Sequence, residues 1–409
     1  MTRFKAAEEP AVEGLAAAAA TPVPAFLPPP NPAPALAPVP AVKTVPGRIG
    51  ELVRFPLKRI HIELTNVCNF DCTFCPKQNM TRKYAYMDAG VAFRIIDQIA
   101  EYHLAEKITF HVMGEPFMHP RFFDILDYAA RLGVPTGITT NGTYLNEEIS
   151  ARLAEVTVTQ MNISLQTPDP ESFKTRLARR MEFREYKERI LSFIAACLRH
   201  RNPPTLKVHF LNTHFRGGVP GLDGRLGTMR VIDSRRELRD TFRYWAAAIH
   251  AVCPSLSAEE SAAVNRRIDH LSIFAWNVVK IAPHVFFETY VLDTWGNAFV
   301  PNTAVVPSKI GYCSALTDHF AILCDGSLTY CCKDFDGNTR VGNIMDQPIV
   351  ALLNSEPVID AIEGFKRFQV RHPYCQKCLG GSTRMRAFGN SFGSIVIWKI
   401  LKNLFYRKG

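Results

Sequence analysis

The sequence has no run of about 18 or more uncharged apolar residues, so it predicts no transmembrane helix. It also lacks a secretory signal, because Glu8, Glu9 and Glu13 lie where an apolar stretch would begin. Aspartate and glutamate are missing from residues 364–409, which hold ten lysines or arginines, while the rest of the chain holds 38 basic and 38 acidic residues. The net charge of +10 therefore reflects one basic end and not a general nucleic-acid-binding surface.

Cysteine is too scarce for a disulfide scaffold, with 11 residues in 409, and it is unevenly spaced. Patterns such as CxxxCxxC and CxxC in a long chain favour metal ligation in a reducing cytosol over disulfide bonding. A hydrophobic content of 47%, with 27 phenylalanines, predicts a folded enzyme with a sizeable core. We therefore expect a cytoplasmic protein.

Proline is concentrated near the start of the chain. Residues 10–46 contain 11 prolines among alanine and valine, a composition that cannot bury a core. We predict a disordered leader over residues 1–56, outside the fold.

Strand-like and helix-like stretches alternate from about residue 57. The predicted strands cover residues 59–64, 107–112, 134–139, 159–165, 206–211 and 285–291. The predicted helices cover residues 89–102, 119–132, 145–155 and 182–200. Repeated βα units predict a parallel sheet with right-handed crossovers, and six units fit a partial (β/α)6 barrel over residues 57–300. Residues 213–282 form an insertion with helix-like stretches at 236–252 and 258–279, either a substrate-facing lid or a packing element.

Three cysteines lie in the segment CNFDCTFC, directly after the first predicted strand. Loops at the carboxyl ends of strands carry the chemistry in barrel-type α/β folds. Cys68, Cys72 and Cys75 can hold a cluster of soft metal ions, and three protein ligands on a four-iron cluster leave one iron open. The alternatives are a zinc site completed by His61 or His103, or three structural cysteines.

This spacing, with the aromatic Phe74 before the third cysteine, resembles the signature of the radical S-adenosylmethionine (SAM) enzymes. The resemblance implies that Cys68, Cys72 and Cys75 hold a 4Fe-4S cluster whose open iron binds SAM. One electron then cleaves SAM, and the 5′-deoxyadenosyl radical abstracts hydrogen from a substrate. It also implies a reductase or flavodoxin-type electron donor.

Polar residues after the later strands match further motifs of this family. Gly114 and Glu115 resemble the glycine-glutamate motif that holds the SAM amino group, a role that suits a carboxylate. Asn141 follows the third strand, and Ser164 and Gln166 belong to the fourth strand with Asn162. The resemblance assigns SAM contacts to Gly114, Glu115, Asn141, Ser164 and Gln166.

A second cysteine region lies within a predicted small C-terminal domain at 301–390, with short strand-like pieces at HFAIL (319–323) and LTYCC (328–332). It resembles the auxiliary-cluster extension called SPASM, or its shorter form, twitch. Cysteine is absent after Cys378, so the count allows one auxiliary 4Fe-4S cluster. Its economical ligand set consists of Cys313, Cys331, Cys375 and Cys378. Cys324 and Cys332 are surplus, and a zinc ribbon built from the same four cysteines is the alternative. The isolated Cys197 and Cys253 are expected in the core.

An auxiliary cluster near the substrate would accept an electron from the substrate radical, which makes the reaction a two-electron oxidation. Such a reaction needs a base, for which Asp334 is the candidate, and its alternative role is to cap the DFDGN turn. A basic amphipathic tail at 391–409 predicts either contact with anionic lipid or packing onto the domain.

Two substrate classes compete. The first is a small polyol or sugar, or a lipid-linked glycan, and the second is a ribosomally made precursor peptide. The Pro/Ala-rich N-terminal segment offers no folded leader-binding domain, which favours the first class. RNA modification is a further alternative, although we recognise no RNA-binding module. The non-enzymatic alternative, a cluster- or zinc-binding scaffold or electron carrier, predicts no SAM binding, and the residues after the second and third strands argue against it.

Overall fold

The computed structural model describes residues 42–178, 180–213, 230–253, 257–292, 295–299, 304–400 and 406–408. One sheet organises these residues, with the strand order β10-β9-β8-β1-β2-β3-β4-β5-β7-β6-β11. Six neighbouring strands run parallel. They are β1 (Arg59–Ile62), β2 (Ile108–Phe110), β3 (Thr136–Thr140), β4 (Gln160–Gln166), β5 (Thr205–Asn212) and β7 (Val285–Val291).

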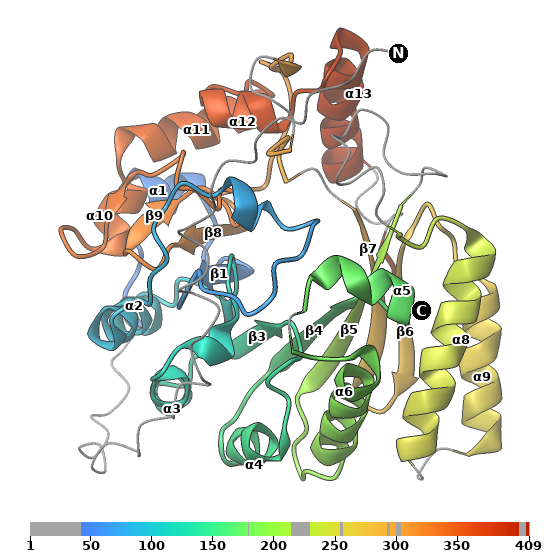
Figure 1. Cartoon of the computed structure of the whole chain (residues 1–409). Helices are drawn as coiled ribbons and strands as arrows, with labels where there is room; N and C mark the ends of the chain where they lie inside the picture. Colours follow the sequence, from blue (N-terminus) through green and yellow to red (C-terminus); the bar gives the residue numbers. More distant parts are fainter. Residues whose placement is uncertain are drawn as a thin grey trace, which may run out of the picture.

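Helices alternate with these strands and surround the sheet in chain order (Figure 1). They are α2 (Ala89–Glu101), α3 (Phe122–Arg131), α4 (Glu147–Glu155), α6 (Phe183–Leu198), α8 (Arg235–Val252) and α9 (Ala258–Asp269). Short helices η1 (Pro76–Asn79), η2 (Pro116–Met118), α5 (Pro170–Phe173) and η3 (Lys174–Arg176) lie in the loops after β1, β2 and β4. The predicted partial (β/α)6 barrel is therefore confirmed.

Alternation along each strand separates an apolar face from a polar face. In β4, Met161, Ile163 and Leu165 are fully buried, whereas Asn162 and Ser164 between them are half-buried. Successive side chains of a strand point to opposite faces, so the apolar set packs against the helices. The polar set faces the concave side of the sheet.

The helix prediction is wrong for one segment of the insertion. Residues 258–279 were predicted to be helical, but the helix ends at Asp269 and a strand, β6 (Trp276–Ala282), follows. Asn277, Val279 and Ile281 alternate as buried positions, and β6 pairs antiparallel with β7. The short apolar run suits a strand once β7 is available as a partner. This part of the insertion therefore belongs to the sheet.

The C-terminal region continues the same sheet. Strand β8 (His319–Ile322) pairs parallel with β1, and β9 (Ser327–Thr329) pairs antiparallel with β8. Both match the strand-like pieces expected there, and β10 (Gly342–Asn343) completes this edge. The helices α10 (Ile349–Leu353), α11 (Glu356–Lys366) and α12 (Pro373–Cys378) follow, at the upper left of Figure 1. The region of the second cysteine set is thus joined directly to the first strand of the barrel.

The predicted leader and tail both differ from the structure. Residues 1–41 lie outside the described part, but α1 (Arg48–Leu52) falls within the predicted leader, and its Ile49 is fully buried. Helix α13 (Arg384–Ile395) crosses the expected boundary at residue 390, and η5 (Val396–Ile400) continues it. The amphipathic helix does not extend to Tyr406, which lies in strand β11 (Tyr406–Lys408) beside β6. Among the described residues, no helix has both the length and the apolar character that crossing a membrane requires.

Candidate active site

The first cysteine loop lies between β1 and α2. Cys72 is buried, Cys68 and Cys75 are half-buried, and the main-chain N–H of Cys75 donates to the carbonyl of Cys72 at 3.0 Å. Burial, with a contribution from the neighbouring thiols, raises the pKa of Cys68 to about 11 and that of Cys75 to about 12. Thiols crowded out of water in this way ionise only with a cation to compensate them. The donor set therefore fits a thiolate-bound metal cluster.

Two cationic side chains support this loop. The Lys77 ammonium donates to the carbonyls of Cys68 at 3.1 Å and Phe70 at 3.2 Å, and it pairs with the Asp71 carboxylate at 2.7 Å. Arg176 is almost fully buried, and its guanidinium lies 4.0 Å from the Cys72 sulfur.

The same guanidinium anchors the end of β4. It donates to Thr167 Oγ1 at 3.0 Å and to the carbonyls of Ser164 and Leu165. Sequence reasoning missed Arg176, because its only signal is a basic residue in a short helix far along the chain.

The predicted glycine-glutamate motif lies directly under the first cysteine loop. Gly114 has a φ of +75°, and a Cβ there would sit 2.3 Å from the carbonyl oxygen of Thr65. The next residue, Glu115, donates its main-chain N–H to Val67 at 2.8 Å. Only glycine allows both this backbone conformation and this close approach.

The Glu115 carboxylate is fully buried and joins two strand ends. It accepts hydrogen bonds from Thr140 Oγ1 at 2.9 Å and from the main-chain N–H of Asn141 at 2.6 Å. Burial raises the pKa of Glu115 to about 7, against the opposing effect of these donors. A carboxylate placed here, close to the cysteine loop, can receive an ammonium group.

Asn141 touches the cysteine loop itself. Its Nδ2 lies 3.6 Å from the Cys68 sulfur and donates to Asn69 Oδ1 at 2.8 Å.

Ser164 of β4 is linked to the cysteine loop through Arg176, which donates a hydrogen bond to the Ser164 carbonyl. Gln166 ends β4 with a φ of +50°, where the pairing with β5 shifts register. The structure therefore gathers Gly114, Glu115 and Asn141 at the cysteines and places Ser164 and Gln166 on the adjoining strand.

The concave face of the sheet is lined by polar side chains that sequence reasoning overlooked. His61 of β1 lies 2.7 Å from Thr109 Oγ1 of β2, and its ring centroid lies 5.7 Å from that of His111. Burial lowers the pKa of His111 to about 4 and that of His209 to about 3, so both are neutral at pH 7. A signal was available, since these residues fall on alternate positions between apolar ones.

Glu288 is the acidic residue of this lining. It is buried on β7, pairs with Lys207 at 2.5 Å, and lies 3.6 Å from the neutral His209 ring. The Tyr290 ring lies 4.4 Å from the His209 ring. A single glutamate in the apolar run VFFETYV was its sequence signal.

The second cysteine set gathers around Cys331. Burial raises the pKa of Cys331 well above its ordinary value, and the thiols of Cys313, Cys332, Cys378 and Cys375 add to this effect. None of the chain's cysteines forms a disulfide, and all lie in the described part of the chain. The predicted ligands therefore converge although up to 65 positions separate them. Cys197 and Cys253 are core residues, as expected.

The two surplus cysteines have different surroundings. Cys324 lies 3.6 Å from the guanidinium of Arg82, which forms a bidentate pair with the buried Glu63 at 2.8 Å. Cys332 instead faces the sheet near His61 and His319.

Asp334 is fully buried and turns inward to its own loop. Its two carboxylate oxygens accept hydrogen bonds from the main-chain N–H and side chain of Asn338, at 2.8 and 3.0 Å, and of Thr339, at 2.6 and 2.7 Å. This is the geometry of the turn-capping alternative. The role of Asp334 as a base stays a prediction.

The loops that carry the two cysteine sets are tied together. Asp336 accepts hydrogen bonds from the main chain and hydroxyl of Thr81, at 2.7 and 2.8 Å. Arg82 Nε donates to the Phe335 carbonyl at 2.9 Å. These hydrogen bonds join the segment after Cys75 to the segment after Cys332.

The chain matches two family models that cover this machinery. Residues 62–223 match the radical SAM superfamily, and residues 313–379 match SPASM, described as an iron-sulfur cluster-binding domain. The chain therefore belongs to the radical SAM superfamily and carries a C-terminal SPASM iron-sulfur domain. This family uses a 4Fe-4S cluster with SAM, and the SPASM domain adds auxiliary iron-sulfur binding.

Known proteins resemble parts of the chain. A tungsten-containing aldehyde ferredoxin oxidoreductase cofactor-modifying protein from Pyrococcus furiosus is 34% identical over 109 residues, which cover 27% of this chain and 31% of that protein. The chain thus spans about a third of that relative.

Two solved structures also resemble the chain. One is BtrN in complex with AdoMet and 2-DOIA (15% identity, 76% of this chain, 88% of that chain, TM-score 0.42). The other is Streptococcus suis SuiB bound to the precursor peptide SuiA (15% identity, 76% of this chain, 67% of that chain, TM-score 0.47). One of these neighbours thus binds a small molecule and the other a precursor peptide.

Proposed function

We propose that this protein oxidises a small hydroxylated substrate by two electrons, the substrate being a polyol, a sugar or a lipid-linked glycan. A 4Fe-4S cluster on Cys68, Cys72 and Cys75 would supply the electron that cleaves SAM to methionine and a 5′-deoxyadenosyl radical. That radical removes one hydrogen atom from a substrate C–H bond and leaves as 5′-deoxyadenosine. The substrate radical then loses a hydroxyl proton to a base and one electron to the auxiliary cluster, which yields a carbonyl.

The polar lining of the concave face carries this proposal. His61, Thr109, His209 and Glu288 offer hydrogen-bond donors and acceptors from four different strands. Hydroxyl-rich substrates need many such partners, because each buried hydroxyl without one costs free energy. The lining begins beside Cys332, the neighbour of Cys331, and β1 leads from His61 to the first cysteine loop.

Glu288 suits the proton-accepting role better than Asp334 does. A base must reach the proton that it removes. Both oxygens of Asp334 accept hydrogen bonds from their own loop, whereas the partners of Glu288 are side chains on the concave face, Lys207 at 2.5 Å and the Tyr290 hydroxyl at 3.4 Å. We assign the base to Glu288.

The test uses anaerobically purified full-length protein reconstituted with iron and sulfide. We expect about eight irons per chain, from two four-iron clusters, and SAM with dithionite should give 5′-deoxyadenosine. A panel of cyclitols, sugars and lipid-linked glycans deuterated at carbon is then screened for deuterium transfer into deoxyadenosine, with formation of a carbonyl. The Glu288→Gln variant should still form deoxyadenosine but should yield little carbonyl.

Three outcomes would contradict the proposal. Deuterium transfer from a short peptide alone would assign the protein to the precursor-peptide maturases. A cluster-loaded protein that neither binds nor cleaves SAM would favour a scaffold or electron carrier. In place of iron, zinc bound at the second cysteine set would remove the electron acceptor from the reaction.

An exposed stripe on α13 supports contact with anionic lipid. Met385, Phe388 and Phe392 are 84%, 70% and 58% exposed, and Arg384 and Arg386 flank them. Apolar side chains beside basic ones on one helix are typical of a membrane-surface segment. Such contact would bring the site to a lipid-linked glycan. The test is partition of the reconstituted protein onto phosphatidylglycerol vesicles, with neutral vesicles as the control.

A further inference from the structure

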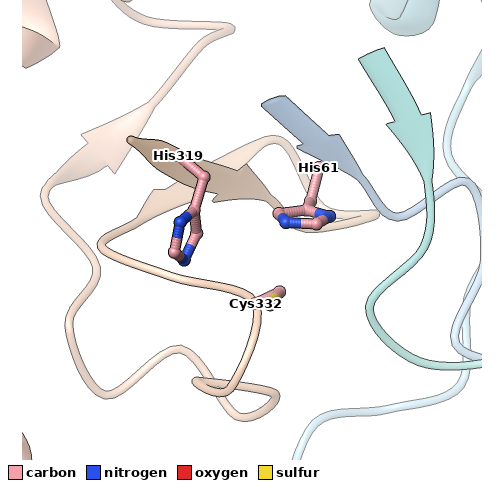
Figure 2. A group of neighbouring side chains, drawn as sticks. All are labelled: His61, His319 and Cys332. Carbon is pink, nitrogen blue, oxygen red and sulfur yellow. The ribbon is translucent and has the colours of Figure 1, made fainter. Parts of the chain in front are cut away.

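Three side chains outside the two predicted cluster sites come together on the concave face. His61 belongs to β1, His319 begins the neighbouring strand β8, and Cys332 lies in the loop after β9. One ligand atom from each residue lies within 4.8 Å of the other two. Figure 2 shows the two imidazole rings on adjacent strands, with Cys332 below them. Histidine nitrogen and cysteine sulfur are the donors that zinc prefers in proteins.

The surroundings orient these donors. Thr109 Oγ1 lies 2.7 Å from His61 Nδ1, so it holds that nitrogen and leaves Nε2 for another partner. The rings of His61 and His319 meet nearly perpendicular, at 84°, with centroids 5.5 Å apart. Hydrogen bonding of the second ring nitrogen is the usual arrangement around a ligating histidine. His61 is only 6% exposed, so few waters compete for its ring.

We propose that His61, His319 and Cys332 bind one divalent transition-metal ion, for which Zn²⁺ is the best match. Two imidazoles and one thiolate suit zinc and exclude the hard ions Mg²⁺ and Ca²⁺. Three protein ligands leave a fourth tetrahedral position for an oxygen donor, either water or a substrate hydroxyl. Binding of the metal does not depend on the proposed oxidation. Only the idea that a substrate hydroxyl occupies the fourth position rests on it.

Cys332 has a competing assignment as a ligand of the auxiliary cluster, because it follows Cys331. The two assignments differ in what the histidines do. His319 has no role in a cluster held by cysteines alone, but it is essential to a mixed histidine-cysteine metal site.

The first measurement is the zinc and iron content of the reconstituted holoenzyme after incubation with Zn²⁺ and gel filtration. We expect one zinc per chain in the wild type, in addition to the iron. His319→Ala and Cys332→Ser should each reduce zinc occupancy by about tenfold or more, with iron unchanged. Cys324→Ser is the matched control, since Cys324 is also a surplus cysteine in this region, and it should retain the zinc.

Other results would overturn the proposal. A wild type without zinc would do so, as would zinc that survives both substitutions. Loss of about four irons in Cys332→Ser, with normal metal content in His319→Ala, would make Cys332 a ligand of a 4Fe-4S cluster. These outcomes do not depend on the substrate or on turnover, so failure here leaves the proposed oxidation standing.

X-ray absorption at the zinc edge provides a second, independent test. The site predicts one sulfur at about 2.3 Å and two nitrogens at about 2.0–2.1 Å. A four-sulfur environment would instead place the zinc at the auxiliary cysteines and overturn the proposal. Thr109→Val serves as a mild variant, because it removes only the hydroxyl that orients His61. It should weaken zinc binding by about tenfold or more while the protein stays folded.

Discussion

Both cysteine sets bring several thiols close together, but they draw them from very different lengths of sequence. The first set spans eight residues of one loop, from Cys68 to Cys75, and cationic side chains lie beside it. The second spans residues 313–378 and converges from two loops and helix α12. Cys331 of that set is crowded by four other thiols.

This difference concerns charge as much as sequence distance. Arg176 and Lys77 place positive charge beside the first set, which would offset the negative charge of a thiolate-bound cluster held there. In the second set, burial is the main cause of the raised pKa of Cys331, and the neighbouring thiols add to it, so Cys331 keeps its proton until a bound metal displaces it. The first set therefore has cationic side chains beside its cysteines, whereas Cys331 of the second set depends on a bound metal to ionise.

The largest expected effect separates the two sets directly. Cys72→Ala should abolish deoxyadenosine formation, since it removes a ligand of the proposed SAM-binding cluster. Cys331→Ala should leave SAM cleavage measurable but remove carbonyl product and about four irons. Anaerobic iron counting with a deoxyadenosine assay checks both variants.

The matched control is Cys197→Ala, at a buried cysteine outside both sets. It should keep both iron content and activity. Equal loss of deoxyadenosine in Cys72→Ala and Cys331→Ala would show that the two sets act as one site, and the contrast between them would fail.

A second prediction concerns the buried guanidinium. Arg176→Met keeps most of the side-chain volume but leaves the carbonyls of Ser164 and Leu165 without their donor. We expect a loss of about 3 kcal/mol in the free energy of unfolding. Thermal unfolding of the iron-free protein measures it, with Arg184→Met on the surface of α6 as the control. An unchanged melting temperature would contradict the anchoring role.

Asp334 provides a smaller effect on the side of the second set. Asp334→Asn should cost about 2 kcal/mol of stability, because its amide would face donors from Asn338 and Thr339. It should leave the pH profile of turnover unchanged, whereas replacing a general base would change that profile. A normal melting temperature with turnover lost, or with the acidic limb of its pH profile lost, would restore Asp334 as the base.

SAM affinity should depend on pH through Glu115. The pKa of this carboxyl is raised to about 7 in the folded protein, so below that pH it is protonated and no longer attracts the SAM ammonium. Between pH 8 and pH 6 we expect SAM binding to weaken by about tenfold. Equilibrium binding of SAM measures this, and Glu115→Gln should bind weakly at both pH values.

The same shift has a consequence for stability. The folded protein holds a proton on Glu115 that the unfolded chain releases at a lower pH. Without SAM, this residue therefore makes folding less favourable as pH rises from about 4.5 to about 7. The difference between wild type and Glu115→Gln across that window isolates the contribution.

The smallest effect is expected on the surface of α13. Replacing Phe388 and Phe392 with serine should change stability by less than about 0.5 kcal/mol, since both rings are exposed. Partition onto anionic vesicles should fall several-fold if the stripe meets lipid. Unchanged partition would leave α13 as a packing helix with a solvated face.

Sequence reasoning worked where chemistry is local. Cys68, Cys72 and Cys75 lie in one loop, so their spacing alone predicts that they come together. Gly114 and Glu115 follow a strand that the pattern of residues predicts. It failed for residues that depend on tertiary pairing. His319 reaches His61 only because β8 lies beside β1, and β6 is a strand only because β7 is next to it. Arg176 likewise needs the fold to bring it to Cys72.

The parallel pairing of β8 with β1 also affects synthesis. Strand β1 is made early, yet the residues that cover this edge, 319–322, lie about 260 positions later. During translation the first strand of the barrel therefore remains an open edge until most of the chain has emerged. Truncations upstream of residue 319 should therefore aggregate instead of yielding an independent barrel. The first strand of the barrel thus depends on the last quarter of the chain for its protection from aggregation.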